Sequence, residues 1–203
     1  MKSGLSFTAL LGVPIFYRAF GRLVNGDARA IYQREYLRVK PGERVLDIGC
    51  GPADMLEVLP NVTYVGFDGS AEYIEAARRR YGERGRFELR RITPGSLSEF
   101  EGFDLVMANG VLHHLDDAGA HELFEIARAA LRPEGRLVTL DGCYTSRQSA
   151  IARYLLSRDR GRFVRTAPDY EALARSHFPS VIAHLRHDLL RIPYTHLILE
   201  CRP

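Results

Sequence analysis

Two glycines and an acid stand together in a pattern that suits nucleotide binding. The apolar run at residues 45–48 carries Asp47 and ends at Gly49, and Gly51 follows one residue later. Glycine has no Cβ, so the backbone can approach a ligand closely at both positions. N–H groups at the start of a following helix could then face that ligand. Two glycines also occur in purely structural turns between a strand and a helix, so this motif needs its context.

A second acid supplies part of that context. Asp68 directly follows the next apolar run, residues 63–67, and lies 17 positions after Gly51. This is close to the separation expected for an acid that binds a ribose. A carboxylate can accept one hydrogen bond from each hydroxyl of a vicinal diol. The alternative is that Asp68 caps the helix that begins near Ser70.

Two histidines follow the fourth apolar run, residues 103–108. His113 and His114 come shortly after Asn109 and Gly110. A histidine titrates near neutral pH, so it can accept a proton from a hydroxyl or an acid. We favour His114 over His113 as a general base, and the alternative is a pair that starts a helix or packs in the core. Further candidates follow the fifth run, at Asp141 and Tyr144.

The elements that would position these residues alternate regularly. Strand-length apolar runs occupy residues 45–48, 63–67, 87–92, 103–108 and 136–140, with two further candidates at 181–186 and 195–201. Helical patterns occupy residues 70–80, 118–131 and 168–177. This alternation predicts an α/β fold with a mostly parallel sheet and helices on both faces. Ligands of such sheets bind at the carboxyl ends of the strands, where the residues above lie.

Length and composition set the domain organisation. The 203 residues suit one domain, 1–203. We divide it into a helical N-terminal lid at 1–40, a cofactor-binding core at 41–142, a substrate-lid insertion at 143–170 and a closing helix with strands at 171–203. Nowhere do roughly 18 apolar residues follow one another, as a membrane span requires. The three cysteines lack CxxC spacing, so we expect no metal site, no disulfide framework and a cytoplasmic location.

Four segments together resemble a known family. Val-Leu-Asp-Ile-Gly-Cys-Gly-Pro at 45–52 and Val-Gly-Phe-Asp-Gly-Ser at 65–70 resemble motifs I and II of class I S-adenosylmethionine-dependent methyltransferases. The stretch Asn-Gly-Val-Leu-His-His-Leu at 109–115 resembles their fourth-strand motif, and Leu-Arg-Pro-Glu-Gly at 131–135 their turn before the fifth strand. The likeness covers about residues 40 to 142 and is nearest to the ubiquinone and menaquinone methyltransferases. It implies a Rossmann-like, seven-stranded sheet whose last strand is antiparallel.

The resemblance also implies which residues bind S-adenosylmethionine. Asp47 would orient the methionine moiety, Asp68 would bind the ribose diol, and Asn109 and Val111 would lie along the methionine arm. The full set implied for the cofactor is Tyr17, Asp47, Gly49, Cys50, Gly51, Asp68, Gly69, Ser70, Ile92, Asn109, Gly110 and Val111. Relatives commonly carry an acid after the third strand that accepts from the adenine amino group. Residues 89–94, Leu-Arg-Arg-Ile-Thr-Pro, contain none, so backbone groups and Ile92 would hold adenine.

The function expected is methyl transfer to the oxygen or nitrogen of a small-molecule acceptor by a monomer or homodimer. The arginines and aromatic residues of 1–40 and 143–170 would suit an anionic acceptor. One alternative is a cofactor-binding protein without turnover. A second is an NAD-binding oxidoreductase, although Asp54 occupies the position of its third glycine. We expect no nucleic-acid partner, because the net charge is only +3 and no Asn/Asp-Pro-Pro-aromatic loop follows the fourth strand.

Overall fold

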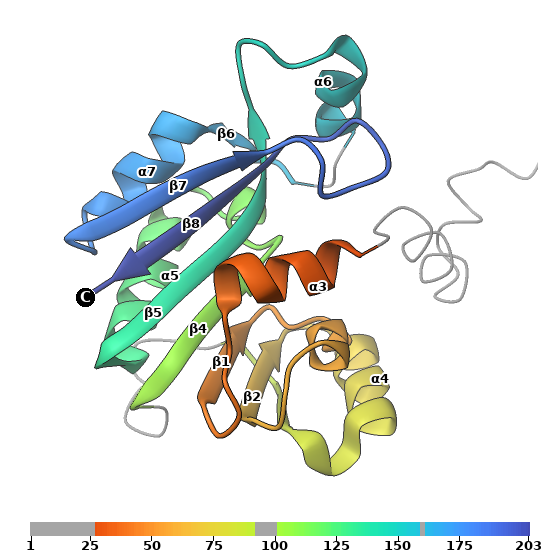
Figure 1. Ribbon diagram of the computed structural model, residues 1–203, viewed down its shortest axis with the longest axis vertical. Helices are drawn as coiled ribbons and strands as arrows, with labels where there is room; N and C mark the ends of the chain where they lie inside the picture. Colours follow the sequence, from red (N-terminus) through yellow and green to blue (C-terminus); the bar gives the residue numbers. More distant parts are fainter. Residues whose placement is uncertain (1–26, 92–100, 159–160) are drawn as a thin grey trace, which may run out of the picture.

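The computed structural model describes residues 27–91, 101–158 and 161–203 (Figure 1). Its sheet has eight strands, of which seven follow one another side by side and the eighth, β6 (Arg165–Thr166), pairs with β5 off this path. The order of the seven across the sheet is β3-β2-β1-β4-β5-β8-β7. These seven strands are β1 (Arg44–Ile48), β2 (Thr63–Asp68), β3 (Arg86–Leu89), β4 (Phe103–Asn109), β5 (Leu131–Tyr144), β7 (Ser180–Arg186) and β8 (His196–Arg202). Of the predicted site residues, Tyr17 and Ile92 lie outside the described part of the chain.

The pairing directions confirm the predicted fold class. Strands β1 to β5 run parallel to one another, and β8 lies antiparallel between β5 and β7. The chain order reverses at β1, which has β2 on one side and β4 on the other. Sheets of this kind bind ligands beyond the carboxyl ends of the strands at such a reversal. The topology therefore predicts that a ligand binds at the carboxyl ends of β1, β2 and β4.

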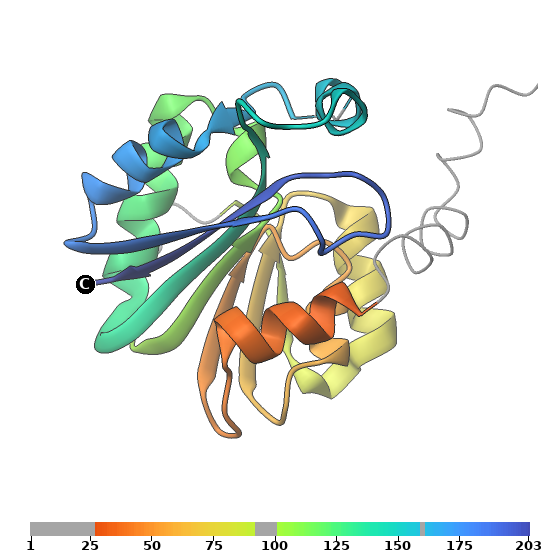
Figure 2. The same ribbon diagram turned by 45° about the horizontal axis from the view of Figure 1, so that its top comes forward.

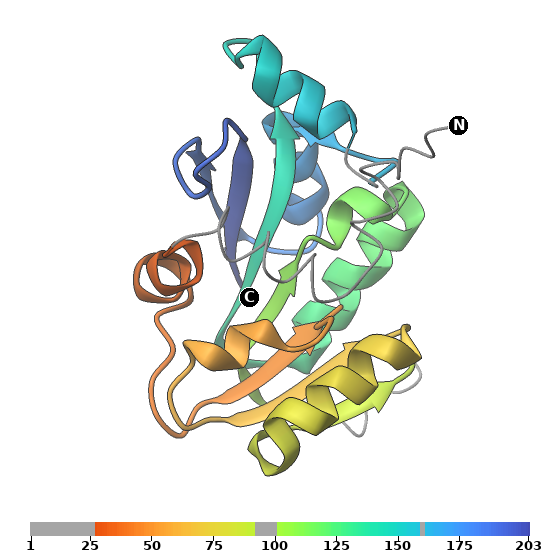
Figure 3. The same cartoon turned by 90° about the vertical axis from the view of Figure 1, so that its right-hand side faces the viewer.

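Strand β5 is much longer than the run at 136–140 from which it was predicted. It extends over 14 residues and pairs with β4 along one edge and β8 along the other. Its last two residues, Cys143 and Tyr144, also pair with the two-residue strand β6 (Arg165–Thr166). The predicted insertion thus includes the end of β5, helix α6 (Ala150–Ser157) and β6. Figure 3 shows α6 beyond the carboxyl end of β5.

Helices cover both faces of the sheet, as predicted (Figures 1 and 2). Helix α3 (Ala28–Tyr32), the π-helical turn η1 (Gln33–Leu37) and α4 (Ala71–Tyr81) contribute to one core. Helices α5 (Asp117–Ala130) and α7 (Ala167–Arg175) contribute to the other. Short 3-10 turns η2 (Asp54–Glu57), η3 (Gly82–Arg84) and η5 (Leu112–His114) complete the described elements.

Side chains along each strand point alternately to the two faces of the sheet, and this explains why two cores form. In β4, Leu105 and Met107 belong to the core under α3 and α4, whereas Val106 and Ala108 belong to the core under α5 and α7. Neighbouring side chains of a strand point to opposite faces, so a strand covered on both sides is apolar throughout. In the described part of the chain, no helix combines the length and the apolar character needed to cross a membrane.

The core under α5 yields a stability prediction. Phe124 is fully buried there, and Phe178 meets its ring edge-on. We expect Phe124→Ala to lower the free energy of unfolding by about 3–5 kcal/mol, because it removes buried apolar area and leaves a cavity. Tyr154→Ala is the matched control, since the Tyr154 side chain on α6 is 57% exposed. Urea unfolding of both variants would check this, and equal losses would contradict the assignment of Phe124 to the core.

Candidate functional site

A cleft of about 470 Å³ lies at the carboxyl ends of β1 and β2, beside the N-terminal half of α5. Five of the residues predicted from the sequence line it: Gly49, Asp68, Gly69, Val111 and His114. The remaining lining residues come from strand ends, from α5 and from the segment before β6, and are Ile48, Phe67, Arg90, Arg91, Leu115, Asp116, Gly119, Glu122, Leu123, Ile126 and Phe163. The sheet therefore brings residues that are distant in sequence to one concave site.

The glycine loop closes the end of β1 against β2. Backbone N–H groups of Gly49 and Cys50 both donate to the carbonyl oxygen of Phe67, at 2.8 and 2.9 Å. Gly49 has φ +73°, and a Cβ there would lie 2.6 Å from Cγ2 of Val111. Gly51 has φ +53°, and a Cβ there would meet no atom within 4 Å. The loop is thus held tightly at Gly49 and leaves open space at Gly51.

One detail of the loop was predicted wrongly. We expected a helix after the glycines, whose first N–H groups would face a ligand. The structure instead has Ala53 in a left-handed conformation, followed by the four-residue 3-10 turn η2. Asp54, at the start of this turn, pairs with Arg80 at 2.8 Å. A turn this short supplies little helix dipole, so side chains must provide most of the charge at this end of the site.

Asp68 connects the loop to the start of α4. Its Oδ2 accepts from the N–H of Gly51 at 2.9 Å, and its Oδ1 accepts from the N–H of Ser70 at 2.8 Å. Ser70 caps α4, because its side chain accepts from the N–H of Tyr73. The cap of α4 is therefore Ser70, and Asp68 accepts from the backbone N–H of that capping residue. Each carboxylate oxygen keeps a second lone pair, so both can also accept from a diol in the cleft.

Asp47 is a buried carboxyl group with one unused oxygen. It is 2% exposed, and the hydroxyl of Tyr64 donates to its Oδ2 at 2.6 Å. Its Oδ1 is buried and has no hydrogen-bond partner among the described residues. Burial raises the pKa of Asp47 to about 7, although the Tyr64 bond lowers it and nearby Asp68 raises it further. A cation beside Oδ1 would favour the ionised form.

Asn109, at the end of β4, also has an unused buried atom. The hydroxyl of Tyr32 donates to its Oδ1 at 2.8 Å, whereas its Nδ2 has no partner in the described structure. Burial raises the pKa of Tyr32, with Asp141 and Asp47 adding to the effect, so the phenol stays neutral. We had assigned Tyr32 only to the N-terminal lid. Nothing in the sequence indicated Asn109 as its partner.

The two histidines of η5 have different surroundings. His113 is buried, and its Nδ1 lies 2.8 Å from Oδ1 of Asp141, which also accepts from the His113 backbone N–H at 3.2 Å. The ring of His114 lines the cleft, and its centroid lies 4.2 Å from that of His113. His114 is therefore the one with access to a ligand in the cleft. The assignment of either residue to catalysis stays a prediction.

Directly after β3, this chain has arginines where relatives commonly have an acid. Arg90 and Arg91 follow β3 directly and line the cleft, and the Arg90 guanidinium lies 5.6 Å from the ring centroid of Phe67. The sequence showed that the acid was missing but not that these side chains reach the cleft. Adenine at this end would therefore meet donors and an aromatic face.

Cys50 packs beneath the loop instead of facing a ligand. Its thiol is buried, and a Cβ at Gly66 would lie 2.8 Å from its sulfur. Burial raises the pKa of the Cys50 thiol, and the charges of Asp47 and Asp68 raise it further. A neutral, enclosed thiol is a poor nucleophile. Cys50 thus contributes its backbone and its volume to the loop.

The residues present fit S-adenosylmethionine. Asp68 offers two acceptor oxygens for a ribose diol, and the open space at Gly51 lets a ligand approach the backbone. The free oxygen of Asp47 suits a cation, and S-adenosylmethionine carries positive charge on its sulfonium and its ammonium. The free Nδ2 of Asn109 suits an acceptor. Buried polar groups without partners are rare, so these atoms favour a polar ligand.

Comparisons with known proteins agree with this geometry. Residues 46–137 match a family profile described as a methyltransferase domain. The chain is 30% identical over 121 residues to malonyl-[acyl-carrier protein] O-methyltransferase of Legionella pneumophila, covering 57% of this chain and 39% of that protein. It is 36% identical over 123 residues to ubiquinone biosynthesis O-methyltransferase of a Bradyrhizobium species, covering 57% and 47%. It is 37% identical over 129 residues to trans-aconitate 2-methyltransferase of Variovorax paradoxus, covering 61% and 47%. The match spans less than half of each of these relatives.

Solved structures show the same fold. The S-adenosylmethionine-dependent methyltransferase SibL has a TM-score of 0.72 at 21% identity, covering 98% of this chain and 63% of that one. Human N-acetylserotonin methyltransferase in complex with its cofactor has a TM-score of 0.66 at 18% identity, covering 100% and 61%. The motifs, the topology and the matched profile agree: residues 46–137 are similar to a methyltransferase domain, and the chain has the fold of solved S-adenosylmethionine-dependent methyltransferases.

Proposed function

We propose that this chain transfers a methyl group from S-adenosylmethionine to an oxygen or nitrogen of a small-molecule acceptor. The observation that carries the proposal is that Gly49 and Asp68 line one cleft, while the buried Oδ1 of Asp47, near the end of β1, has no described partner. These groups suit a ribose and a positively charged amino acid moiety. The matches to malonyl-[acyl-carrier protein] O-methyltransferase, ubiquinone biosynthesis O-methyltransferase and trans-aconitate 2-methyltransferase support the same reaction.

The chain's own residues would bind and align the reactants. Asp68 would accept hydrogen bonds from the ribose hydroxyls, and Asp47 would stabilise positive charge through Oδ1. Asn109 would donate from Nδ2 to a carboxylate oxygen. When bound, S-adenosylmethionine supplies a methyl group that its sulfonium has already activated. The protein therefore contributes mainly alignment and a fixed electrostatic environment.

An acceptor hydroxyl or acid must also lose a proton. The ring of His114 lines the cleft, so this histidine would accept the proton at one of its ring nitrogens. His113 would act indirectly, because its contact with Asp141 fixes the conformation of the turn that carries both histidines. Asp141 also has a buried Oδ2 without a partner in the described part of the chain. That oxygen is a second candidate acceptor for a proton or a hydrogen bond.

An anionic acceptor fits the charges near the end of β5. The described arginines of residues 143–165 are Arg147, Arg153, Arg158, Arg162 and Arg165. The guanidinium of Arg153 lies 5.5 Å from the ring centroid of Tyr144, at the end of β5. Arginine binds carboxylates in a forked geometry. Two of the similar enzymes are named for acidic substrates, malonyl-[acyl-carrier protein] and trans-aconitate.

The proposal is tested first by binding and then by turnover. Calorimetry with S-adenosylhomocysteine should show one site per chain, and NAD⁺ should not compete for it. Incubation of the protein with methyl-labelled S-adenosylmethionine and a panel of carboxylates, phenols and amines should then release labelled product. Tight NAD⁺ binding would favour the oxidoreductase alternative. Cofactor binding without turnover on the whole panel would favour a binding protein.

The ribose assignment predicts the behaviour of Asp68→Asn. This change removes the charge from a group expected to accept two hydrogen bonds, each worth about 1.5–3 kcal/mol when one partner is charged. S-adenosylhomocysteine should bind at least about 100-fold more weakly, while the melting temperature shows that the fold persists. Glu72→Gln, an exposed acid four residues away on α4, is the matched control and should bind normally. Unchanged affinity in the Asp68 variant would remove the ribose role.

The raised pKa of Asp47 predicts that cofactor affinity depends on pH. Below about pH 7 the free protein holds this carboxyl group protonated, and a cationic ligand must displace that proton. The affinity should therefore rise with pH and be about tenfold higher at pH 8 than at pH 6. Calorimetry in buffers of different ionisation enthalpy should detect a proton released on binding near pH 6.5. Asp47→Asn should flatten the pH profile, and a steep profile in that variant would assign the proton to another group.

The assignment of His114 as the general base predicts that its loss lowers kcat but leaves cofactor affinity nearly unchanged. With any acceptor found on the panel, His114→Ala should lower kcat by about 100-fold or more, because proton transfer by a positioned base contributes about 10²–10⁴-fold. The affinity for S-adenosylhomocysteine should change by less than about threefold. His121→Ala, on α5 and not in the cleft, is the control. An unchanged kcat in the His114 variant would exclude this residue as the base.

A further inference from the structure

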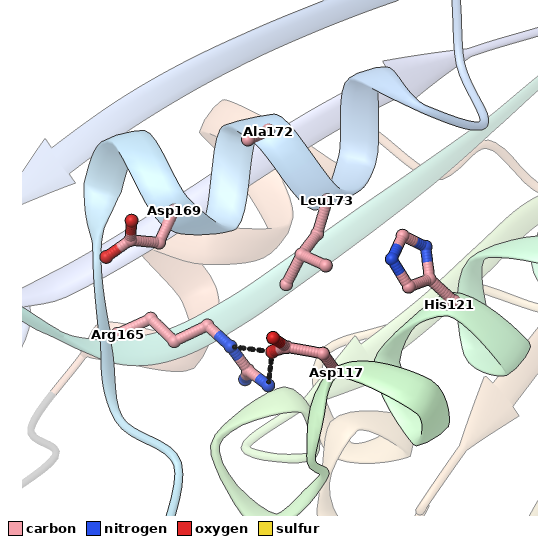
Figure 4. Close-up of a pocket in the computed structure, with 6 residues that line it drawn as sticks. All are labelled: Asp117, His121, Arg165, Asp169, Ala172 and Leu173. Atoms are coloured by element: carbon pink, nitrogen blue, oxygen red, sulfur yellow. Dashed lines mark hydrogen bonds and ion pairs between the residues drawn. The ribbon is translucent and has the colours of Figure 1, made fainter.

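Arg165 on β6 is a charged side chain in an almost enclosed position. Only 9% of its side chain is exposed, although it lines a hollow of about 510 Å³ between α5 and α7. Figure 4 shows it extending from β6 toward Asp117 at the start of α5. Its guanidinium also lies 5.6 Å from the ring centroid of Tyr170. A charge is buried at a cost in solvation unless its donors find partners, so its contacts indicate what it does.

Besides Asp117 and the carbonyl oxygen of Phe163, Arg165 contacts the two ends of the turn that carries the histidines. Its Nη1 donates to the carbonyl oxygen of Leu112 at 3.1 Å, and its Nη2 donates to that of Leu115 at 2.8 Å. Leu112 begins η5, and Leu115 is the residue directly after it. One planar group therefore fastens both ends of the segment that contains His113 and His114.

The segment just before Arg165 contacts the same turn. The N–H of Phe163 donates to the carbonyl oxygen of His113 at 2.9 Å. A Cβ at Gly161 would lie 2.0 Å from Cδ2 of His113, so this backbone lies directly against the imidazole ring. Residues 161–165 thus pack against the turn, at atoms of His113 other than the Nδ1 that contacts Asp141. The contacts of Phe163 and Gly161 reach His113, whereas those of Arg165 reach the residues on either side of the histidine pair.

This turn forms part of the wall of the cleft. Val111, His114 and Leu115 all line it. Within the turn, the N–H of His114 donates to Val111 and that of Leu115 donates to Leu112. A single 3-10 turn has weak hydrogen-bond geometry and little stability of its own. Its position must therefore be set by the groups packed around it.

We propose that Arg165 is a positioning residue that sets this wall of the cleft by holding the Leu112–Leu115 turn. The proposal rests on the proposed function, because the wall matters only if the cleft holds the cofactor. Arginine suits the task because its rigid fork reaches two carbonyl oxygens at once, whereas the single ammonium of lysine does not. Asp117 has a lesser role. Both Nε and Nη2 of Arg165 donate to its Oδ1, but its side chain is 76% exposed and its ion pair is screened by water.

The test compares Arg165→Lys and Arg165→Met with Arg175→Met. Arg175, on α7, also donates to a backbone carbonyl, that of Val181 at 3.1 Å, and pairs with Glu171 at 3.2 Å. It is therefore a matched arginine whose contacts lie away from the turn. Three quantities are measured for each protein: the melting temperature, the affinity for S-adenosylhomocysteine, and the amide hydrogen exchange of His114 and Leu115.

We expect both Arg165 variants to bind S-adenosylhomocysteine about tenfold or more weakly, and to exchange the His114 and Leu115 amides at least about tenfold faster. Arg175→Met should lower the melting temperature without either effect. A third variant, Arg165→Ala, should lose affinity likewise and regain it with ethylguanidinium at millimolar concentration, because this small molecule can enter beside the hollow and replace the missing group. Arg165→Lys keeps the stem and the charge, so it is the variant expected to remain folded.

Two results would overturn the proposal. The first is an Arg165→Lys protein with wild-type affinity and wild-type amide exchange. The second is an equal loss of affinity in the Arg165 and Arg175 variants, since that would indicate general destabilisation. If the wild-type protein does not bind S-adenosylhomocysteine at all, the proposed function fails. The amide exchange of the turn would then still decide whether Arg165 holds it.

Discussion

The register between β1 and β2 is the constraint on which the site depends. Ile48 pairs with Phe67, so both strands end at the same level of the sheet. The carbonyl oxygen of Phe67 can then accept from two N–H groups of the glycine loop, and the next residue, Asp68, reaches Gly51. A shift of one residue would point every side chain of β1 to the opposite face. The loop, the acid and the start of α4 are therefore fixed by one strand pairing.

That pairing also places a carboxyl group where an apolar side chain would be more stable. Asp47 is the second-last residue of β1, between Leu46 and Ile48, and is almost completely buried. Tyr64, on the neighbouring strand, satisfies one oxygen and leaves the other without a described partner. Residues that cost stability at a strand end and have perturbed pKa values are typical of functional sites. The buried acid is thus best explained by a ligand that carries positive charge.

The sequence predicted the parts of the site that local patterns encode. Apolar runs followed by glycine, aspartate or asparagine located β1, β2 and β4, and Ser70 gave the start of α4. The partners of the site residues were not predictable in the same way. Tyr64 bonds to Asp47 and Tyr32 to Asn109 across 17 and 77 residues, and no spacing in the chain links the members of either pair. Such contacts arise from the order of the strands, which only the folded chain shows.

The same reason explains why the sequence did not distinguish Arg165 from the other arginines of residues 143–170. Its partners are backbone carbonyls about 50 residues earlier, and any residue type supplies a carbonyl. The structure thereby shows that the arginines have different positions and contacts. Arg165 is occupied in holding the turn, Arg90 and Arg91 face the cleft beyond β3, and Arg153 lies near the end of β5. The carboxyl groups of Asp47 and Asp68 lie at the ends of β1 and β2, and Arg90 and Arg91 line the cleft that Asp68 also lines. A cationic donor bound inside and an anionic acceptor bound at the rim would each meet opposite charge, so the two reactants would be drawn to different parts of the same site.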